Sequence, residues 1–217
     1  MLNWKRADMF LFLNLVLLLS ANGLAPGCES QPTDVGSRHA PRASTLQRTS
    51  VKKKRPLRKP DVIYYPTPPE TVAEMLRLAH IQKGDVLYDL GSGDGRIPIA
   101  AAQQFGIRAV GIEIDPKLVA EAQAKAREAG VSELVQFRNE DMFRVNVSEA
   151  TVVTLYLSEK LNVLLRPKLL SELRPGARIL SHDFRMGDWK PEQTVRVPWG
   201  KLYRTVYVWT VPPRGRS

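Results

Sequence analysis

Residues 88–97 read YDLGSGDGRI and follow directly from an apolar run, DVLYDL, at residues 85–90. Three glycines alternate in this stretch, and two aspartates accompany them: Gly91, Gly93, Gly95, Asp89 and Asp94. Residues without a Cβ allow unusual backbone angles and let a ligand approach the backbone amides. A short buried strand, a glycine turn and a helix start predict the first βα unit of a doubly wound sheet, with its ligand at the turn.

The rest of the chain repeats this alternation of strand and helix. Further strands are expected at 108–114, 134–138, 151–157 and 177–184, and helices at 96–104, 116–129 and 160–173. Repeated βα units imply a parallel sheet covered by helices on both faces.

The two ends of the fold carry their own signals. Thr67 is expected to cap a first helix, with Pro68 at its first position and Glu70 completing a capping box. The last run, QTVRVPWGKLYRTVYVWTV, has no room for a crossover helix, so it predicts an antiparallel hairpin. The fold class is therefore α/β: a doubly wound seven-stranded sheet, mostly parallel, with an antiparallel C-terminal hairpin.

The formal net charge of +10 lies mostly near the N-terminus. Residues 1–60 hold 11 of the 32 Lys and Arg residues but only 3 of the 22 Asp and Glu residues. The remainder is nearly neutral, which argues against nucleic acid as a partner of the fold. Three scattered histidines and a single cysteine offer no metal-ligand spacing. We expect no metal, no nucleic-acid partner and a monomer.

The N-terminal segment is expected to lie outside the fold. Two basic residues precede MFLFLNLVLLL, which is short for a bilayer crossing, so residues 1–28 are interpreted as a signal peptide or membrane anchor. Cys28 is either a lipidation site or an incidental thiol. Residues 29–60 predict a disordered basic linker, and residues 61–217 the folded domain. Association with a membrane or the cell envelope follows, with the side of the membrane left open.

The glycine turn lacks the spacing of a nicotinamide site. Arg96 stands where G-x-G-x-x-G requires its third glycine. Asp89 and Asp94 are poor neighbours for pyrophosphate, but they can accept from ammonium or hydroxyl groups. A turn-stabilising role for Asp94 is the alternative. Glu113 ends the second strand, 22 residues after Gly91, where a carboxylate can accept from two ribose hydroxyls.

A further acidic position follows the third strand. Asp141 is suited to accept from the exocyclic amine of adenine, and Met142 and Phe143 can pack on the base. Ribose, adenine and a cationic amino-acid end together indicate S-adenosylmethionine. The residues expected to bind it are Asp89, Gly91, Ser92, Gly93, Asp94, Gly95, Glu113, Asp141 and Met142.

Three stretches, DLGSGDGRI, GIEID and NEDMF, resemble motifs of the class I S-adenosylmethionine-dependent methyltransferases, over roughly residues 61–211. With YYPTPPETVAEML and ATVVTLYL, the likeness is closer to the small seven-strand lysine methyltransferases that act on mitochondrial ATP-synthase and nucleotide-translocase subunits, and to their bacterial relatives. The resemblance implies a Rossmann-like fold and methylation of an accessible lysine in a protein substrate.

Methylation of lysine needs a neutral amine aligned with the methyl group. The rate should therefore depend mainly on how the protein positions the amine and excludes water. Candidate catalytic residues are Tyr156, His182 and Asp183, at the ends of the fourth and fifth strands. Candidate substrate-binding residues are Tyr65 and Thr67. Core packing of Tyr156 and a backbone hydrogen bond of Asp183 are the alternatives.

Two other functions stay open on the sequence. A methyltransferase for a small molecule or lipid would carry the same cofactor motifs. A non-catalytic module that binds the cofactor, or nucleic acid through the basic N-terminus, is the alternative of another class. The predicted signal peptide raises a conflict with this cofactor. S-adenosylmethionine is made in the cytosol, so an enzyme exported across the membrane would lack its methyl donor.

Overall fold

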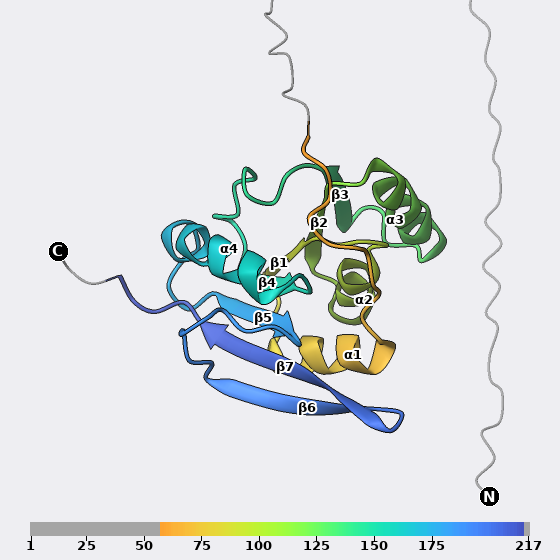
Figure 1. The fold of residues 1–217 in the computed structure, drawn as a ribbon. Coiled ribbons are helices and arrows are strands. Elements are labelled where there is room, and N and C mark those ends of the chain that lie inside the picture. The colour runs from red at the N-terminus through yellow and green to blue at the C-terminus, as the bar shows by residue number, and fades with distance from the viewer. Residues whose placement is uncertain (1–56, 215–217) are drawn as a thin grey trace, which may run out of the picture. The chain divides into compact units, whose positions relative to one another are not determined.

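The computed structural model describes residues 57–214 (Figure 1). The predicted signal peptide or anchor, the lipidation site at Cys28 and most of the basic linker lie outside these residues. Residues 57–60 of the expected linker do belong to the described chain, and Arg58 makes side-chain hydrogen bonds to Asp141. Within residues 57–214, no helix is long and apolar enough to cross a membrane.

Seven strands form one sheet in the order β3-β2-β1-β4-β5-β7-β6 (Figure 1). The strands β1 to β5 run parallel, whereas β7 pairs antiparallel with both β5 and β6. The predicted α/β class and the antiparallel C-terminal hairpin are confirmed. The strands are β1 (Val86–Leu90), β2 (Arg108–Glu113), β3 (Val135–Asn139), β4 (Val152–Leu155), β5 (Arg178–His182), β6 (Gln193–Trp199) and β7 (Leu202–Thr210).

Helices cover both faces of the sheet and create two apolar cores (Figure 1). Residues of α1 (Pro69–Leu78), α2 (Arg96–Phe105) and α3 (Pro116–Glu128) share the first core, and residues of α4 (Glu159–Glu172) belong to the second. Because side chains alternate along a strand, Leu87 of β1 joins the first core and Tyr88 joins the second. The central strand is thus buried on both sides.

Thr67 does not cap the first helix. The N-cap is Pro68, no side chain caps the helix, and α1 begins at Pro69. The Thr67 hydroxyl lies instead 3.2 Å from Nδ1 of His182 at the end of β5. The predicted capping box is therefore wrong, because a buried contact from a distant strand replaces the local one. Asp115 does cap α3, by accepting from the amide of Lys117 at 2.8 Å.

The strand order fixes where a ligand can bind. From β1, the chain proceeds outward through β2 and β3 on one side, then returns to β4 on the other side of β1. At such a reversal the connections leave in opposite directions, and a crevice opens outside the carboxyl ends of the central strands. The glycine turn after β1 lies at this crevice.

Candidate active site

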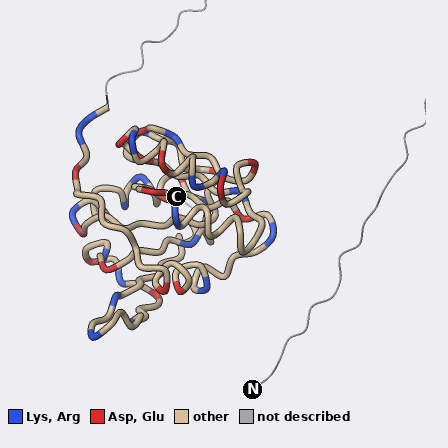
Figure 2. The backbone as a smooth tube through the Cα atoms, turned by 90° about the vertical axis from the view of Figure 1, so that its right-hand side faces the viewer, with Lys and Arg blue, Asp and Glu red and all other residues tan. Residues whose placement is uncertain are grey.

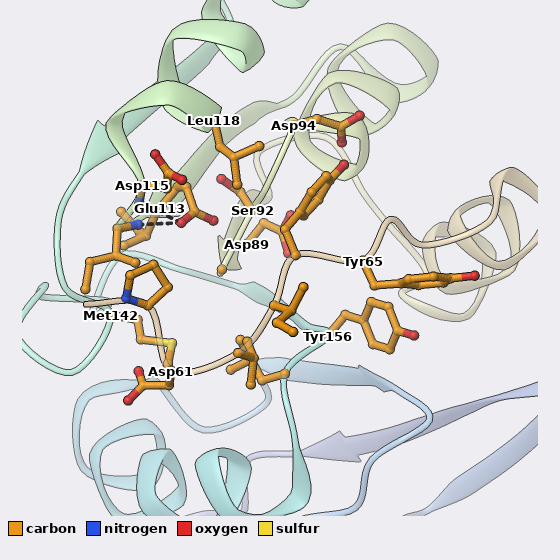
Figure 3. Close-up of a pocket in the computed structure, with 18 of the residues that line it drawn as sticks. Asp61, Tyr65, Asp89, Ser92, Asp94, Glu113, Asp115, Leu118, Met142 and Tyr156 are labelled. Atoms are coloured by element: carbon orange, nitrogen blue, oxygen red, sulfur yellow. Dashed lines mark hydrogen bonds between the residues drawn. The ribbon is translucent and has the colours of Figure 1, made fainter. Parts of the chain in front are cut away.

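A cavity of about 400 Å³ lies outside the carboxyl ends of β1, β2 and β4 (Figure 3). Most of its wall comes from the glycine turn, the end of β2, the segment after β3, the end of β4 and residues 58–67, which we call the strap; α3 and α4 add Leu118 and Leu161. The volume falls within the roughly 300–1,000 Å³ typical of ligand pockets. Five parts of the chain that are distant in sequence therefore meet at one site.

The three glycines of the turn lie next to different groups. All three have positive φ, of 84°, 52° and 80°. Gly91 lines the cavity, whereas a Cβ on Gly93 would lie 2.3 Å from the ring of Tyr64. A Cβ on Gly95 would lie 2.4 Å from the ring of Phe137. The predicted bare backbone thus borders the cavity at Gly91, and Gly95 instead permits close packing of α2 on β3.

Asp89 is the buried acid of the cavity wall. It is 3% exposed, and its Oδ1 accepts a 2.8 Å hydrogen bond from the hydroxyl of Thr154 on β4. Burial raises the pKa of Asp89 to about 7, against the effect of the Thr154 hydrogen bond. A positively charged ligand beside this carboxyl group would favour its ionised form. The position therefore suits a cation.

Asp94 is paired with cations of the protein itself. Arg96 donates to its two oxygens at 2.9 and 2.8 Å, and Lys125 Nζ lies 2.6 Å from Oδ2. Burial disfavours the charged carboxylate, but the hydrogen bonds from Arg96 and Lys125 outweigh it and hold the pKa of Asp94 well below its ordinary value. Asp94 thus ties the turn to α2 and α3, as the turn-stabilising alternative expects, although it also borders the cavity.

Glu113 closes the end of β2 onto the glycine turn. Its Oε2 accepts from the amide of Gly93 at 2.9 Å, and its Oε1 accepts from the amides of Ile114 and Asp115 at 2.7 and 2.9 Å (Figure 3). A carboxylate oxygen accepts about two hydrogen bonds, so only Oε2 keeps capacity for another donor. In this arrangement Glu113 can take one ribose hydroxyl, rather than the two that the sequence suggests.

Asp141 does not line the cavity, although its neighbours Glu140 and Met142 do. Its buried carboxylate accepts from Nε and Nη2 of Arg58 at 2.9 and 3.2 Å, and from the amide of Phe143 at 3.0 Å. Burial alone would raise the pKa of Asp141, but the hydrogen bonds from Arg58 and Phe143 lower it below the ordinary value. The structure thus pairs Asp141 with the strap, where the sequence suggests a contact with adenine.

Two tyrosines lie side by side at one end of the cavity, Tyr65 from the strap and Tyr156 from the end of β4 (Figure 3). Tyr65 is 54% exposed, so this end borders solvent. The ring of Tyr156 stacks on the imidazole of His182, with centroids 3.8 Å apart. His182 and Asp183 do not line the cavity, so of the three predicted catalytic residues only Tyr156 reaches it.

Asp183 and His182 instead support the wall from behind. Asp183 has a left-handed backbone with φ of 61°, which costs about 1–3 kcal/mol in a residue other than glycine. Its carboxylate accepts from the amide of Thr205 at 2.7 Å and from Arg204 at 3.1 Å. Burial lowers the pKa of His182 to about 4, with Asp183 opposing the effect, so the imidazole is neutral at pH 7.

Sequence reasoning misses several residues of this site. Most belong to the strap: Arg58, Asp61, Val62, Ile63 and Tyr64 line the cavity. The paired aromatic residues in YYP are the local signal for this segment, and of the two only Tyr65 is a predicted substrate-binding residue. Nothing in the sequence indicates that the strap crosses the carboxyl ends of the strands on its way to α1, as Figure 1 shows.

The residues present fit S-adenosylmethionine by their chemistry. Asp89 supplies negative charge beside the bare backbone at Gly91, and Leu118 and Met142 supply apolar walls for a planar base. The hydroxyl of Ser92 is buried at the cavity and has no hydrogen-bond partner among residues 57–214. A buried polar atom without a partner is rare and is consistent with a ligand that completes it.

Comparison with known proteins supports the same reading. Residues 89–193 match the family described as the ANTKMT methyltransferase domain. The chain is 42% identical over 153 residues to the protein-lysine N-methyltransferase of Saccharolobus islandicus, covering 70% of this chain and 95% of that protein. It is 40% identical over 110 residues to the adenine nucleotide translocase lysine N-methyltransferase of Mus musculus, covering 50% of this chain and 48% of that protein.

A solved structure is also similar. It is described as an RNA methyltransferase from Salinibacter ruber in complex with S-adenosyl-L-homocysteine. The identity is 53%, the TM-score is 0.66, and the match covers 70% of this chain and 97% of that chain. Similar proteins therefore carry the names of two different acceptors, lysine and RNA.

Proposed function

The chain belongs to the same methyltransferase family as the protein-lysine N-methyltransferase of Saccharolobus islandicus, and from this premise we propose that it transfers a methyl group from S-adenosylmethionine to a lysine side chain of a protein. Its enzyme class and its cofactor, S-adenosylmethionine, are as predicted from the sequence. The proposal that lysine is the methyl acceptor rests on the 42% identity over 95% of a protein named for lysine methylation. The paired tyrosines at the open end of the cavity agree with it.

At the cofactor end, S-adenosylmethionine supplies a methyl group bound to a positively charged sulfur. We assign Asp89 to the cationic amino-acid end, where the backbone is bare at Gly91 and the hydroxyl of Ser92 lacks a partner among the described residues. Oε2 of Glu113 takes a ribose hydroxyl, and Met142 packs on the base. The other residues expected from the sequence shape the turn: Gly93, Asp94 and Gly95.

At the acceptor end, Tyr65 and Tyr156 orient the lysine chain toward the cavity. An ammonium group has no lone pair, so the lysine must release its proton before it can attack. Apolar walls disfavour the charged amine, and the exposed side of Tyr65 leaves a route for the proton to solvent. Leu157 and Leu161 line the cavity next to Tyr156 and exclude water from the reacting atoms.

His182 and Asp183 act through other residues in this scheme. His182 is fully buried against Tyr156 and does not border the cavity, so it cannot take a proton from the substrate. Thr67, which does line the cavity, hydrogen-bonds His182 and fixes its ring. We therefore treat His182 and Asp183 as positioning residues for Tyr156 and for the wall behind it.

RNA is the second candidate acceptor, because a 53% identical protein is described as an RNA methyltransferase. RNA binding relies on basic surface, since neutralised phosphates supply most of the affinity. Residues 61–217 hold 21 Lys and Arg against 19 Asp and Glu, and the two kinds are interspersed along the described backbone (Figure 2). This balance favours protein over RNA. A small molecule or lipid remains the third alternative.

Label transfer separates these acceptors. Purified full-length protein is incubated with cell extract and methyl-labelled S-adenosylmethionine, and the product is divided for protease, ribonuclease and organic extraction. We expect protease-sensitive label that acid hydrolysis yields as methyl-lysine. Ribonuclease-sensitive or extractable label without methyl-lysine would exclude the lysine assignment. Gly91→Arg is the control. The introduced arginine side chain should fill the cofactor cavity and abolish methyl transfer, and circular dichroism checks that the variant is folded.

We also propose that residues 1–28 attach the enzyme to a membrane with the catalytic domain on the cytosolic side. The support is chemical, because the methyl donor is made in the cytosol and an exported domain would lack it. Protease protection on intact cells and on opened cells tests this arrangement. The domain is expected to resist protease in intact cells and to fractionate with membranes; cleavage in intact cells would contradict it.

A further inference from the structure

The strap forms the outer wall of the cavity. Nine of the lining residues come from residues 58–67, more than from any other segment. The strap contains no helix or strand, and it passes over the carboxyl ends of the strands before it enters α1 (Figure 1). A ligand that fills the cavity therefore lies beneath it.

The strap is attached at its two ends and through two tyrosines between them, of which Tyr65 has its ring centroid 6.0 Å from the guanidinium of Arg204. At its beginning, Arg58 binds both carboxylate oxygens of Asp141, and its guanidinium lies 4.7 Å from the ring centroid of Phe143. At its end, the carbonyl of Thr67 accepts from Arg96 at 2.9 Å. Between these points, the ring of Tyr64 lies on Gly93 of the glycine turn.

The attachment at Arg58 differs from the others because little else supports it. The side chain of Arg58 is 32% exposed, whereas that of Asp141 is 3% exposed, so a partly exposed cation meets a buried anion. Further along, Ile63 is 96% exposed and Val62 is also exposed, so this part of the strap has no apolar core of its own. Segments with few buried contacts open first.

From these contacts we infer that the strap is a lid over the cofactor, and that the Arg58–Asp141 pair holds it closed and sets how fast the cofactor and its demethylated product leave. Asp141 is thus an anchor for the lid, in place of an adenine acceptor. The inference rests on the proposed function only for the identity of the cofactor and its place in this cavity. It is independent of the acceptor.

The dissociation rate of S-adenosylhomocysteine reports directly on how firmly the lid is closed. The full-length protein is loaded with this product, and its release is followed by stopped-flow competition with excess S-adenosylmethionine. Arg58→Met keeps apolar packing on Phe143 and removes the charge. We expect release to become about three- to tenfold faster, because mutations that weaken a bound state act mainly on dissociation. Arg77→Ala, which removes an exposed ion pair with Glu74 on α1, is the control and is expected to leave release unchanged.

A double-mutant cycle assigns the effect to the pair. Asp141→Asn retains an oxygen that can accept from the amide of Phe143, so the local turn should persist. If the pair acts as a unit, Asp141→Asn accelerates release as Arg58→Met does, and the double variant is no faster than either. Effects that multiply, or release in Arg58→Met within about twofold of the wild type, would overturn the inference.

Limited chymotrypsin digestion provides a second measurement that needs no turnover. The bond between Tyr64 and Tyr65 lies in the middle of the strap. We expect S-adenosylhomocysteine to protect this bond in the wild type and much less in Arg58→Met. Equal protection in both proteins would show that Arg58 does not hold the strap. If label transfer identifies RNA as acceptor while these results hold, the lysine assignment fails and the lid stands.

Discussion

The ring of Tyr156 lies against the imidazole of His182, with 3.8 Å between the centroids and 29° between the planes. His182 is fully buried, and only one of its ring nitrogens has a hydrogen-bond partner among the described residues, the hydroxyl of Thr67. The second nitrogen, Nε2, lies 3.5 Å from Oδ2 of Asp183. A neutral ring fits this environment, because a charged one would lose its water with little compensation.

Stability should therefore fall in weak acid through His182. Burial lowers the pKa of His182 to about 4, below the ordinary 6.5. Between these values the unfolded chain binds more protons than the native one, so the free energy of unfolding decreases as pH falls from about 6.5 to about 4. The full shift corresponds to about 3 kcal/mol. Urea unfolding at several pH values measures it.

His182→Phe is the matched variant for this measurement, because it keeps an aromatic ring beside Tyr156 and cannot be protonated. Carboxylates titrate in both proteins, so the quantity to compare is the wild-type free energy minus that of the variant. We expect this difference to favour the wild type more at pH 7 than at pH 4.5. A difference that is independent of pH would show that His182 is not neutral through burial.

Cofactor affinity should depend on pH through Asp89. Burial raises the pKa of Asp89 to about 7, so a large fraction of the protein carries a neutral carboxyl group just below neutrality. A cationic ligand prefers the ionised form, so affinity should rise with pH and level off above about 7. One pH unit below the pKa corresponds to about a tenfold loss.

Calorimetric titration with S-adenosylmethionine at pH 6 and pH 8 tests this dependence, and proton release on binding gives a second signal. Asp89→Asn keeps the size and a hydrogen bond with Thr154, and it should bind weakly at both pH values. A wild-type affinity that does not change between pH 6 and pH 8 would mean that Asp89 stays ionised without the ligand.

Local patterns predict the frame of this protein well. The strand DVLYDL, the turn with its glycines and the helix that follows lie adjacent in sequence, so apolar periodicity and turn chemistry are sufficient to place them. The antiparallel hairpin is recognisable because two β-rich runs stand too close together for a crossover helix. The position of Asp141, in the stretch NEDMF, is also predicted correctly, since it follows β3.

Side-chain partners are not predictable in the same way. Thr67 meets His182 from 115 positions away, and Arg58 meets Asp141 from 83 positions away. Neither pair leaves a periodic signal, because each depends on which segments the completed sheet brings together. Local rules therefore assign Thr67 to a helix cap, which is wrong because a buried partner competes, and they give no sign that Arg58, within the predicted linker, pairs with a buried aspartate.

The two glycines that flank α2 allow the cost of overpacking to be separated from the cost of backbone strain. Gly95 and Gly106 both have positive φ, of 80° and 63°. A Cβ on Gly95 would meet the side chains of Phe137 and Ala122 within 3 Å, whereas a Cβ on Gly106 would meet nothing within 4 Å. Gly106→Ala should cost about 1 kcal/mol through backbone strain alone.

Gly95→Ala adds overpacking to the same strain, which costs a further 1–3 kcal/mol or so. Urea unfolding of the two variants measures both values, with Gly106→Ala as the control for backbone strain. Equal destabilisation of the two would indicate that Phe137 can move aside at no cost, and that Gly95 is required only for its backbone angle.

Asp183 should affect turnover while leaving cofactor binding intact. Its carboxylate holds the amide of Thr205 and the guanidinium of Arg204, and its backbone is left-handed. Asp183→Ala removes both contacts and places alanine in the unfavourable conformation, so the wall that supports Tyr156 should shift. We expect kcat on a verified protein acceptor to fall about tenfold, because small displacements from the reactive geometry are costly.

Asp183→Asn separates positioning from a loss of fold. Asparagine tolerates a left-handed backbone and can still accept from the amide of Thr205. Its kcat should recover most of the loss, and the affinity of both variants for S-adenosylhomocysteine should match the wild type, because Asp183 does not border the cavity. Unchanged turnover in Asp183→Ala would remove Asp183 from the mechanism. A parallel loss of cofactor affinity would place it at the cofactor end.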